Sequence, residues 1–423
     1  MNKIILIGNG FDLAHGLKTS YEDFIYWYWK QCGYNLLHCS EKEMSDGLCS
    51  FKVKDRENAF SWAMAFQGWR YQRDNPFFKL NEIDALNAAV NDRDYCDFSI
   101  ISPLFQRICK QMSFGWVDIE NEYYSMLVEY KGMKGELEKL NKDLAVIQGL
   151  LVKYLNEIQK KEINEELVND DIKSRMLAPL RKKEIAVSSE PYWTYFVHDR
   201  ADINGINKMS YILHDYGKYG MDIENLRKIL NKNQTKLFLG DVEGNEADVF
   251  LLPDRIMLLN FNYTKTADLY MLDNPRFVVN HIHGELSNSG SVIFGYGDES
   301  DDEYRAIVKQ NDNEYLKHIK TNRYLETTNY RELLSFINSD AYQVCIMGHS
   351  CGNSDRTLLN TLFEHRNCVS VKPYYYISKD GKDNYLDIIQ NISRNFTDMK
   401  LMRDRVVNKV FCEPLITYKE SLE

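Results

Sequence analysis

The sequence lacks several patterns that would place the protein in a broad class. No run of eighteen apolar residues occurs in the 423 residues, so we expect no membrane-spanning helix. The 52 lysines and arginines do not outnumber the 62 aspartates and glutamates, and a net charge of −10 argues against a primary nucleic-acid binder. An apolar run directly after Met1 leaves no room for a secretory signal. We therefore expect a cytoplasmic protein.

The sequence also holds little that indicates a metal site. Its nine cysteines form no Cys-x-x-Cys pair, which argues against a zinc ribbon or a redox dithiol. His281 and His283 share one face of a predicted strand, but no third ligand follows at a zinc-site spacing. The acidic run at residues 298–303 lacks EF-hand spacing and predicts a solvated loop. We expect no metal.

The most informative segment that is present is the start of the chain, where an apolar run at residues 3–7 meets a glycine-rich turn at Gly8 and Gly10. Such a run predicts a buried strand of a parallel sheet. Glycine lacks a Cβ and lets phosphate oxygens approach backbone N–H groups, so the turn predicts a phosphate cradle. A dinucleotide fingerprint would have a third glycine where Leu13 stands. A tight turn without a ligand is therefore the alternative.

The last third of the chain alternates short apolar runs with helical patterns, as in a parallel α/β sheet. Helices are predicted at 357–365 and 383–396, and strands at 256–261, 278–282, 292–294, 344–347 and 374–377. If residues 3–7 join this sheet, one α/β domain comprises residues 1–20 and 250–423. Residues 21–249 are then a large helical insertion; the alternative is two independent domains.

The insertion contains one strongly periodic segment. Its apolar residues alternate three and four positions apart, which is a heptad seam, at Leu137, Leu140, Leu144, Ile147, Leu151, Tyr154 and Ile158. Pro179 closes the segment. We expect a helical hairpin near residues 133–180, and a dimer contact is the alternative.

Polar residues cluster directly after four predicted strands, at residues 8–20, 260–264, 281–285 and 348–355. The carboxyl ends of parallel strands line the ligand crevice, so these clusters converge on one site if the strands are neighbours. Asn262 both donates and accepts hydrogen bonds, which suits the orientation of a ribose hydroxyl or a water; a helix cap is its other role. His283, before a glycine, is typical of a general base or of a buried hydrogen-bonded residue.

The turn from Gly348 to Gly352 has the Gly-x-Ser-x-Gly form of a nucleophile elbow, with Ser350 at its centre. A serine hydrolase is therefore a minor alternative. Its histidine would have to be His365, which lies in the predicted helix that follows the elbow itself. The simpler interpretation is a glycine turn in which Ser350 and Asp355 cap that helix.

Five blocks of the chain carry a family resemblance, at residues 6–21, 260–264, 281–284, 294–298 and 348–350. In sequence and order they resemble the AbiH family of bacterial phage-defence proteins. This resemblance implies a role in abortive infection.

The same blocks are similar, more distantly, to sirtuin-like NAD-consuming domains of bacterial defence systems. That similarity implies a Rossmann-type, sirtuin-like sheet with Asn262 and His283 as the catalytic pair. The implied nucleotide-binding residues are Gly8, Asn9, Gly10, Asp12, Thr19, Gly348, Ser350 and Asp355. Because no zinc ribbon is present, the similarity does not imply lysine deacylation.

The implied reaction is hydrolysis of the nicotinamide–ribose bond of NAD, or of a related nucleotide, through an oxocarbenium-like transition state. A neutral His283 would bind or deprotonate a ribose hydroxyl near pH 7. Asn262 would position ribose or water, and Asp12 would suit a ribose hydroxyl better than a phosphate. The alternative is a non-catalytic nucleotide-sensing module whose helices, also a candidate surface for a second copy or a defence partner, transmit the bound state.

Overall fold

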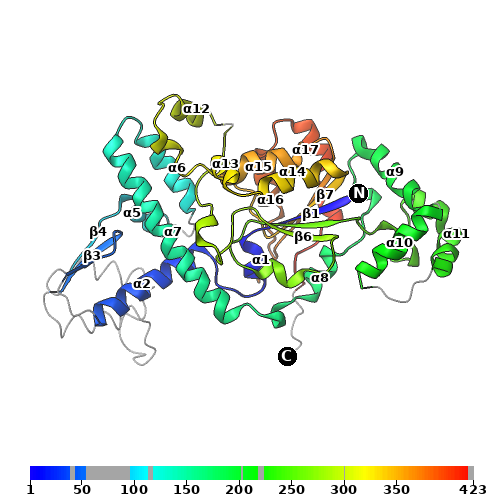
Figure 1. The fold of residues 1–423 in the computed structure, drawn as a ribbon, viewed down its shortest axis with the longest axis horizontal. Helices are drawn as coiled ribbons and strands as arrows, with labels where there is room; N and C mark the ends of the chain where they lie inside the picture. The colour runs from blue at the N-terminus through cyan, green and yellow to red at the C-terminus, as the bar shows by residue number, and fades with distance from the viewer. Residues whose placement is uncertain are drawn as a thin grey trace.

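A parallel sheet forms the centre of the molecule (Figure 1). The computed structural model describes residues 1–38, 43–53, 96–112, 118–201, 203–217, 223–299 and 301–417. Within these residues the sheet has five strands in the order β6-β5-β1-β7-β8, and every neighbouring pair is parallel. The strands are β1 (Asn2–Ile7), β5 (Ile256–Asn260), β6 (Phe277–His281), β7 (Tyr342–Met347) and β8 (Cys368–Tyr374). The prediction of a parallel α/β sheet that includes residues 3–7 is confirmed.

Two of the strand predictions are wrong. Residues 292–294 are irregular, although their apolar side chains are buried. The last strand is Cys368–Tyr374, which lies earlier in the chain than the predicted strand at residues 374–377 and shares only Tyr374 with it. Its polar residues Ser370 and Lys372 interrupt the apolar pattern, but both are buried and paired, with Gln343 and with Glu184. A pattern based on hydrophobicity therefore did not predict this strand, because its polar residues are buried together with hydrogen-bonding or ionic partners.

Alternate side chains of β1 face opposite layers of the sheet, as the two-residue period of a strand requires. Ile4 and Leu6 pack with the helices above the sheet in Figure 1. These are α14 (Asn329–Ser339), α15 (Arg356–Phe363), α16 (Tyr385–Arg394) and α17 (Met399–Arg405). The helices predicted at 357–365 and 383–396 are confirmed by α15 and α16. Ile5 and Ile7 pack on the other face, where α1 (Asn9–Ala14) and α8 (Asp170–Met176) lie.

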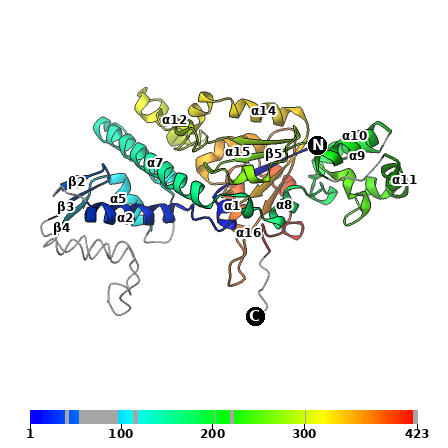
Figure 2. The same cartoon turned by 60° about the horizontal axis from the view of Figure 1, so that its bottom comes forward.

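Two groups of helices flank the sheet at its opposite ends (Figures 1 and 2). Where the strands begin lie α9 (Glu190–Arg200), α10 (Ile203–Asp215) and α11 (Ile223–Leu239). Where the strands end lies a second group, which we call the helical lobe. It contains α2 (Tyr21–His38), α5 (Pro103–Met112), α6 (Ile119–Glu129) and α7 (Lys134–Glu162). The apolar core of the lobe also includes Leu286, Phe294, Tyr296, Ile307 and Tyr315, so the lobe packs on the segment that follows β6.

The helical lobe differs from the predicted insertion in two respects. Within its described residues it contains a three-stranded antiparallel sheet of β2 (Glu43–Ser45), β3 (Cys49–Val53) and β4 (Cys96–Ile100). The predicted hairpin near residues 133–180 is wrong, because residues 134–162 form one helix and only short helices follow it. The heptad seam of α7 is buried in the core it shares with α2, α5 and α6. The chain's own helices thus occupy the seam that was a candidate dimer contact.

The shorter helices α12 (Asp302–Val308) and α13 (Lys320–Arg323) lie in the chain between β6 and α14. The predicted solvated loop at residues 298–303 is partly packed: Asp298 pairs with Arg356, and Asp301 accepts a hydrogen bond from Tyr124. Within the described residues, none of the helices combines the length and the apolar composition that crossing a membrane requires.

Candidate functional site

The glycine turn after β1 packs directly on the turn after β7. The Gly10 N–H donates to the Gly348 carbonyl at 2.8 Å. A Cβ on Gly8 would lie 2.6 Å from His349 Cα, and one on Gly348, whose φ is +78°, would lie 2.0 Å from the Phe11 nitrogen. These glycines are therefore required for the close approach of two backbones. The packing also occupies the Gly10 N–H that the sequence assigned to a phosphate, which corrects that part of the predicted cradle.

The solvent-facing rim of the strand ends holds several of the predicted residues. Asn262 follows β5, and its side-chain N–H donates to the Gly8 carbonyl at 3.0 Å. The Thr19 hydroxyl donates to Asn9 Oδ1 at 2.6 Å. Asn9 and Ser350 are exposed, and Asn262 is half-buried. The rim therefore brings polar groups from the ends of β1, β5 and β7 together at the surface.

Asp12 lies beneath this rim and points into the protein. It is 1% exposed, and its Oδ2 accepts a hydrogen bond of 2.6 Å from the Thr264 hydroxyl. Within the described residues its Oδ1 has no hydrogen-bond partner. Burial raises the pKa of Asp12 to about 6, and hydrogen bonds from Thr264 and its neighbours oppose that rise. Asp12 is thus a buried acid, although the sequence predicted a contact with a ribose hydroxyl.

His283 follows β6 and is buried beside a carboxylate. Its Nε2 lies 3.2 Å from Asp355 Oδ1 and 3.2 Å from the Tyr324 hydroxyl. Its ring meets the Phe261 ring edge to face, with the centroids 5.1 Å apart. Burial lowers the pKa of His283, and the charge of Lys320 lowers it further. The imidazole is therefore neutral near pH 7 and is held by a carboxylate.

Asp355 is the common partner of a buried group of charges. Lys320 Nζ lies 2.9 Å from Asp355 Oδ1 and 2.9 Å from Glu120 Oε2. Lys320 and His283 hold the pKa of Asp355 well below its usual range. Burial raises the pKa of Glu120 to about 7, although Lys320 opposes this effect. Because Glu120 belongs to α6, the group joins the helical lobe to the strand ends.

His349 completes the group from the turn after β7. Its Nε2 lies 3.7 Å from Asp355 Oδ2, and its Nδ1 accepts the Cys351 N–H at 3.0 Å. Burial lowers the pKa of His349 to about 4, so it is neutral near pH 7. Its accepting Nδ1 requires that any ring proton be on Nε2, the nitrogen that faces Asp355. We call Glu120, Lys320, Asp355, His283, His349 and Tyr324 the buried polar network.

His281 does not pair with His283. Its Nδ1 lies 3.1 Å from the Asn260 side-chain nitrogen, and its Nε2 lies 3.2 Å from Asp268 Oδ2. His283 contacts Asp355 and Tyr324 instead. The two histidines that share a strand face in the sequence thus have separate partners.

The arrangement required for a serine hydrolase is not formed. His365 packs on the ring of Tyr342, where β7 begins, whereas Ser350 follows the end of the same strand. Within the described residues, positive φ outside glycine occurs at Asn311 and Cys351, so the strained position of the turn is not the serine. Ser350 and His365 are separated by the length of β7, which contradicts the serine-hydrolase alternative.

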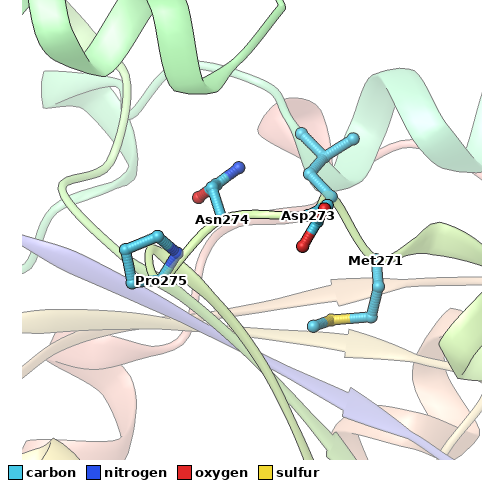
Figure 3. Close-up of a pocket in the computed structure, with 5 residues that line it drawn as sticks. Met271, Asp273, Asn274 and Pro275 are labelled. Atoms are coloured by element: carbon cyan, nitrogen blue, oxygen red, sulfur yellow. The ribbon is translucent and has the colours of Figure 1, made fainter.

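A hollow of about 490 Å³ lies away from this network. Figure 3 draws the residues that line it, in the loop between β5 and β6, and labels Met271, Asp273, Asn274 and Pro275. The lining is formed by Met271, Leu272, Asp273, Asn274 and Pro275. These residues immediately precede β6, so the hollow lies where that strand begins, opposite the predicted site residues.

Comparison with known families decides the relationship of the chain. A family model described as bacteriophage abortive infection AbiH matches residues 4–376. The chain belongs to the AbiH family. No curated protein and no solved structure matches it. The match contains the glycine turn, the rim and the whole buried polar network, whereas the sirtuin-like similarity is not shown by these comparisons.

The sequence did not reveal three members of the AbiH chain's buried polar network. Glu120 lies among other polar residues of α6, and Lys320 and Tyr324 belong to no motif. These residues come from segments far from the strand-end clusters and meet them only in the folded chain. His349 was detectable, because it lies within the Gly348–Gly352 turn that had drawn attention for its serine.

Proposed function

We propose that this AbiH-family chain is an abortive-infection effector that hydrolyses the nicotinamide–ribose bond of NAD or of a related nucleotide. One observation carries the proposal. A neutral imidazole, His283, is held 3.2 Å from the carboxylate of Asp355 at the carboxyl ends of a parallel sheet. In open α/β sheets, nucleotides bind at the carboxyl ends of the strands, at the point where the strand order changes direction. In this sheet that point lies at β1, because β5 and β6 lie on one side of it and β7 and β8 lie on the other.

The proposed chemistry needs a base more than an acid. The bond between ribose C1′ and the nicotinamide nitrogen breaks, and its electron pair leaves with the already cationic nicotinamide. A water molecule adds to C1′ and loses a proton. His283 would bind a ribose hydroxyl or take a proton as general base, and Asp355 would stabilise the imidazolium that results. Asn262 would orient ribose or water from the rim, where its amide already donates to the Gly8 carbonyl.

The nucleotide would lie over the rim rather than in the glycine turn itself. Its polar contacts would come from Asn9, Thr19, Ser350 and Asn262, while Gly8 and Gly348 would hold the two turns together beneath it. In this proposal NAD is the substrate, the helical lobe is the surface for a second copy or a defence partner, and the protein acts in the cytoplasm.

A second candidate function is nucleotide sensing without turnover. It is favoured by the burial of His283, which is 4% exposed, and by the Glu120–Lys320 pair that closes the lobe over it. In this candidate function, a ligand that reached His283 displaces this contact. Binding would then change the position of the lobe, which is the behaviour of a sensor.

The test is nicotinamide release from NAD by the purified full chain, His283→Ala, Asn262→Ala and the control His365→Ala. We expect release by the wild type and by His365→Ala, with a loss of at least about 100-fold in His283→Ala, because general-base catalysis contributes 10²–10⁴-fold. Asn262→Ala should lose less. Binding of ADP-ribose without any nicotinamide release would favour the sensor, and loss of activity in His365→Ala would show that the effect of His283→Ala is not specific to that histidine.

A further inference from the structure

Lys320 is a buried cation placed one contact away from His283. Its side chain is 1% exposed, and its Nζ lies 2.9 Å from Asp355 Oδ1 and 2.9 Å from Glu120 Oε2. Asp355 Oδ1 also lies 3.2 Å from His283 Nε2. The ammonium and the imidazole therefore share one carboxylate oxygen. We therefore expect a substitution of Lys320 to change the hydrogen bonding and the charge of the Asp355 oxygen that faces His283.

Glu120 holds Lys320 from the opposite side. Its Oε1 accepts the Gly295 N–H at 3.1 Å, and its Oε2 faces Lys320 Nζ, so both carboxylate oxygens are used. Tyr124, one turn further along α6, stacks on Tyr296 with the ring centroids 3.8 Å apart. These contacts fix α6 against Gly295 and Tyr296, and the Lys320 N–H in turn donates to the Tyr296 carbonyl at 2.9 Å. The lobe thereby determines where the ammonium lies.

We propose that Lys320 is the positioning residue of this site: its ammonium binds the Asp355 oxygen that faces His283 and keeps that carboxylate directed at the imidazole. Glu120 is the contact by which the helical lobe holds Lys320 in place. This inference rests on the proposed function only for the activity it predicts, because the effect on the imidazole is measurable without any substrate.

The charges around His283 fix the direction of the expected change. Asp355 favours the imidazolium, and Lys320 opposes it. The other titratable groups beside it are the Tyr324 hydroxyl, the Tyr263 ring at 6.4 Å and His349, which shares Asp355. Lys320→Met removes the opposing charge and leaves Asp355 to pair with His283 alone. The pKa of His283 should then rise.

The experiment follows the nine histidines of the full chain by NMR after selective ¹³C labelling, with His283→Gln to assign the signal. We expect the pKa of His283 to rise by at least one unit in Lys320→Met and to stay near the wild-type value in Lys320→Arg. Lys320→Met/Glu120→Gln removes one charge of each sign and replaces the single variant if that variant does not fold. An unchanged pKa in the folded variant would overturn the inference.

The activity readout separates this inference from the proposed function. Nicotinamide release by Lys320→Met should fall at least tenfold at pH 7, through kcat rather than KM, and recover as the pH rises above the new pKa of His283. Lys320→Arg should restore the wild-type pH profile. If the wild type releases no nicotinamide, the proposed function fails, whereas the NMR titration still decides the role of Lys320. A uniform loss at every pH would indicate a merely structural lysine.

Discussion

Two lysines of this chain are buried to the same extent in different regions and have opposite electrostatic behaviour. Lys3, in the central strand, and Lys320, at the strand ends, are each 1% exposed. Lys3 Nζ donates to the carbonyls of Met176 and Ala178, and burial lowers its pKa. Lys320 faces two carboxylates, which raise its pKa in spite of burial. Burial alone therefore does not decide the state of a lysine; its partners do.

The surroundings of the two lysines explain why only one belongs to a candidate site. Near Lys3, Glu184 is paired through both oxygens, with Lys372 at 2.8 Å and with Gln343 at 3.1 Å. These contacts join the segment around Glu184 to Gln343 in β7 and Lys372 in β8, so each polar group there is used in packing. Near Lys320 the polar groups are histidines and acids on turns after the strands. Residues on such turns can take part in binding or catalysis, because they lie outside the hydrogen-bonded strands that hold the sheet together.

The sharpest test of this comparison is Lys320→Met. It leaves Glu120 buried without its cation and Asp355 with His283 in place of Lys320, and breaking a buried pair in this way costs about 3–5 kcal/mol. Urea unfolding at pH 7 measures the loss in free energy of unfolding. The control is Lys317→Met, whose lysine is exposed and pairs with Glu314, and for which we expect a loss of less than about 1 kcal/mol. A loss as small as that of the control would show that Lys320 does not neutralise the site.

Gly348→Ala tests whether the turns position the strand-end region. Its Cβ would lie 2.0 Å from the Phe11 nitrogen, at a φ of +78°. Gly16→Ala is the matched control, because Gly16 has a φ of +76° and nothing within 4 Å of its Cβ position. We expect the control to lose about 1 kcal/mol in free energy of unfolding, from backbone strain alone, as measured by urea unfolding. Gly348→Ala should lose about 1–3 kcal/mol more, because its Cβ also clashes with Phe11. Equal losses would mean that the two turns do not need their close contact.

Asp12→Asn tests a buried carboxylate that is held by hydrogen bonds from hydroxyls, in contrast to Asp355, which is paired with the Lys320 ammonium. Burial raises the folded-state pKa of Asp12 to about 6, so the folded chain binds its proton more tightly than the unfolded chain. This contribution to stability is present below pH 4 and is lost as the pH rises through 6. Asparagine does not titrate, so the variant does not lose this stability as the pH rises. Relative to the wild type, its free energy of unfolding should increase by up to about 3 kcal/mol between pH 3.5 and 7.5.

Urea unfolding across that pH range provides the measurement for Asp12→Asn. Asp387→Asn, at an exposed position of α16, is the control. A gap between Asp12→Asn and the wild type that does not change with pH would show that Asp12 titrates normally.

Lys3→Met is expected to have the smallest effect. It removes the cost of burying an amine, but it leaves the carbonyls of Met176 and Ala178 without their donor. These terms oppose each other, so we expect a change within about 1–2 kcal/mol. The same urea titration as for Lys320→Met measures it. A loss of about 4 kcal/mol would erase the difference between the two lysines.

Local pattern predicted the parts of the fold in which apolar residues are contiguous. The central strand at residues 3–7, the strands before Asn262 and His283, and the strand before Gly348 were all recognised from short buried runs. The last strand was misplaced because Lys372 is buried in it with a partner 188 residues away. A pattern method reads a lysine as solvent-facing, and only the presence of Glu184 reverses that interpretation.

The helical lobe shows the same limit at larger scale. The three-and-four spacing of α7 correctly indicated a helix with one apolar face, but that face has the same pattern whether it packs on a hairpin partner, a second copy or neighbouring helices. The structure buries it against α2, α5 and α6. The choice among these partners is a matter of tertiary packing, because periodicity specifies a face and not what covers it.

By itself, the sequence determined the parallel α/β sheet, the meeting of polar clusters at its strand ends and membership of the AbiH family. Those properties depend on local periodicity, on strand direction and on motifs that stand contiguously in the chain. Tertiary structure alone decided that Gly8, Gly10 and Gly348 serve the contact of two turns, that Asp12 points inward, and that Glu120 and Lys320 complete the network around His283. Each of these depends on burial and on partners distant in the chain, because desolvation and Coulomb interactions act through space rather than along the sequence.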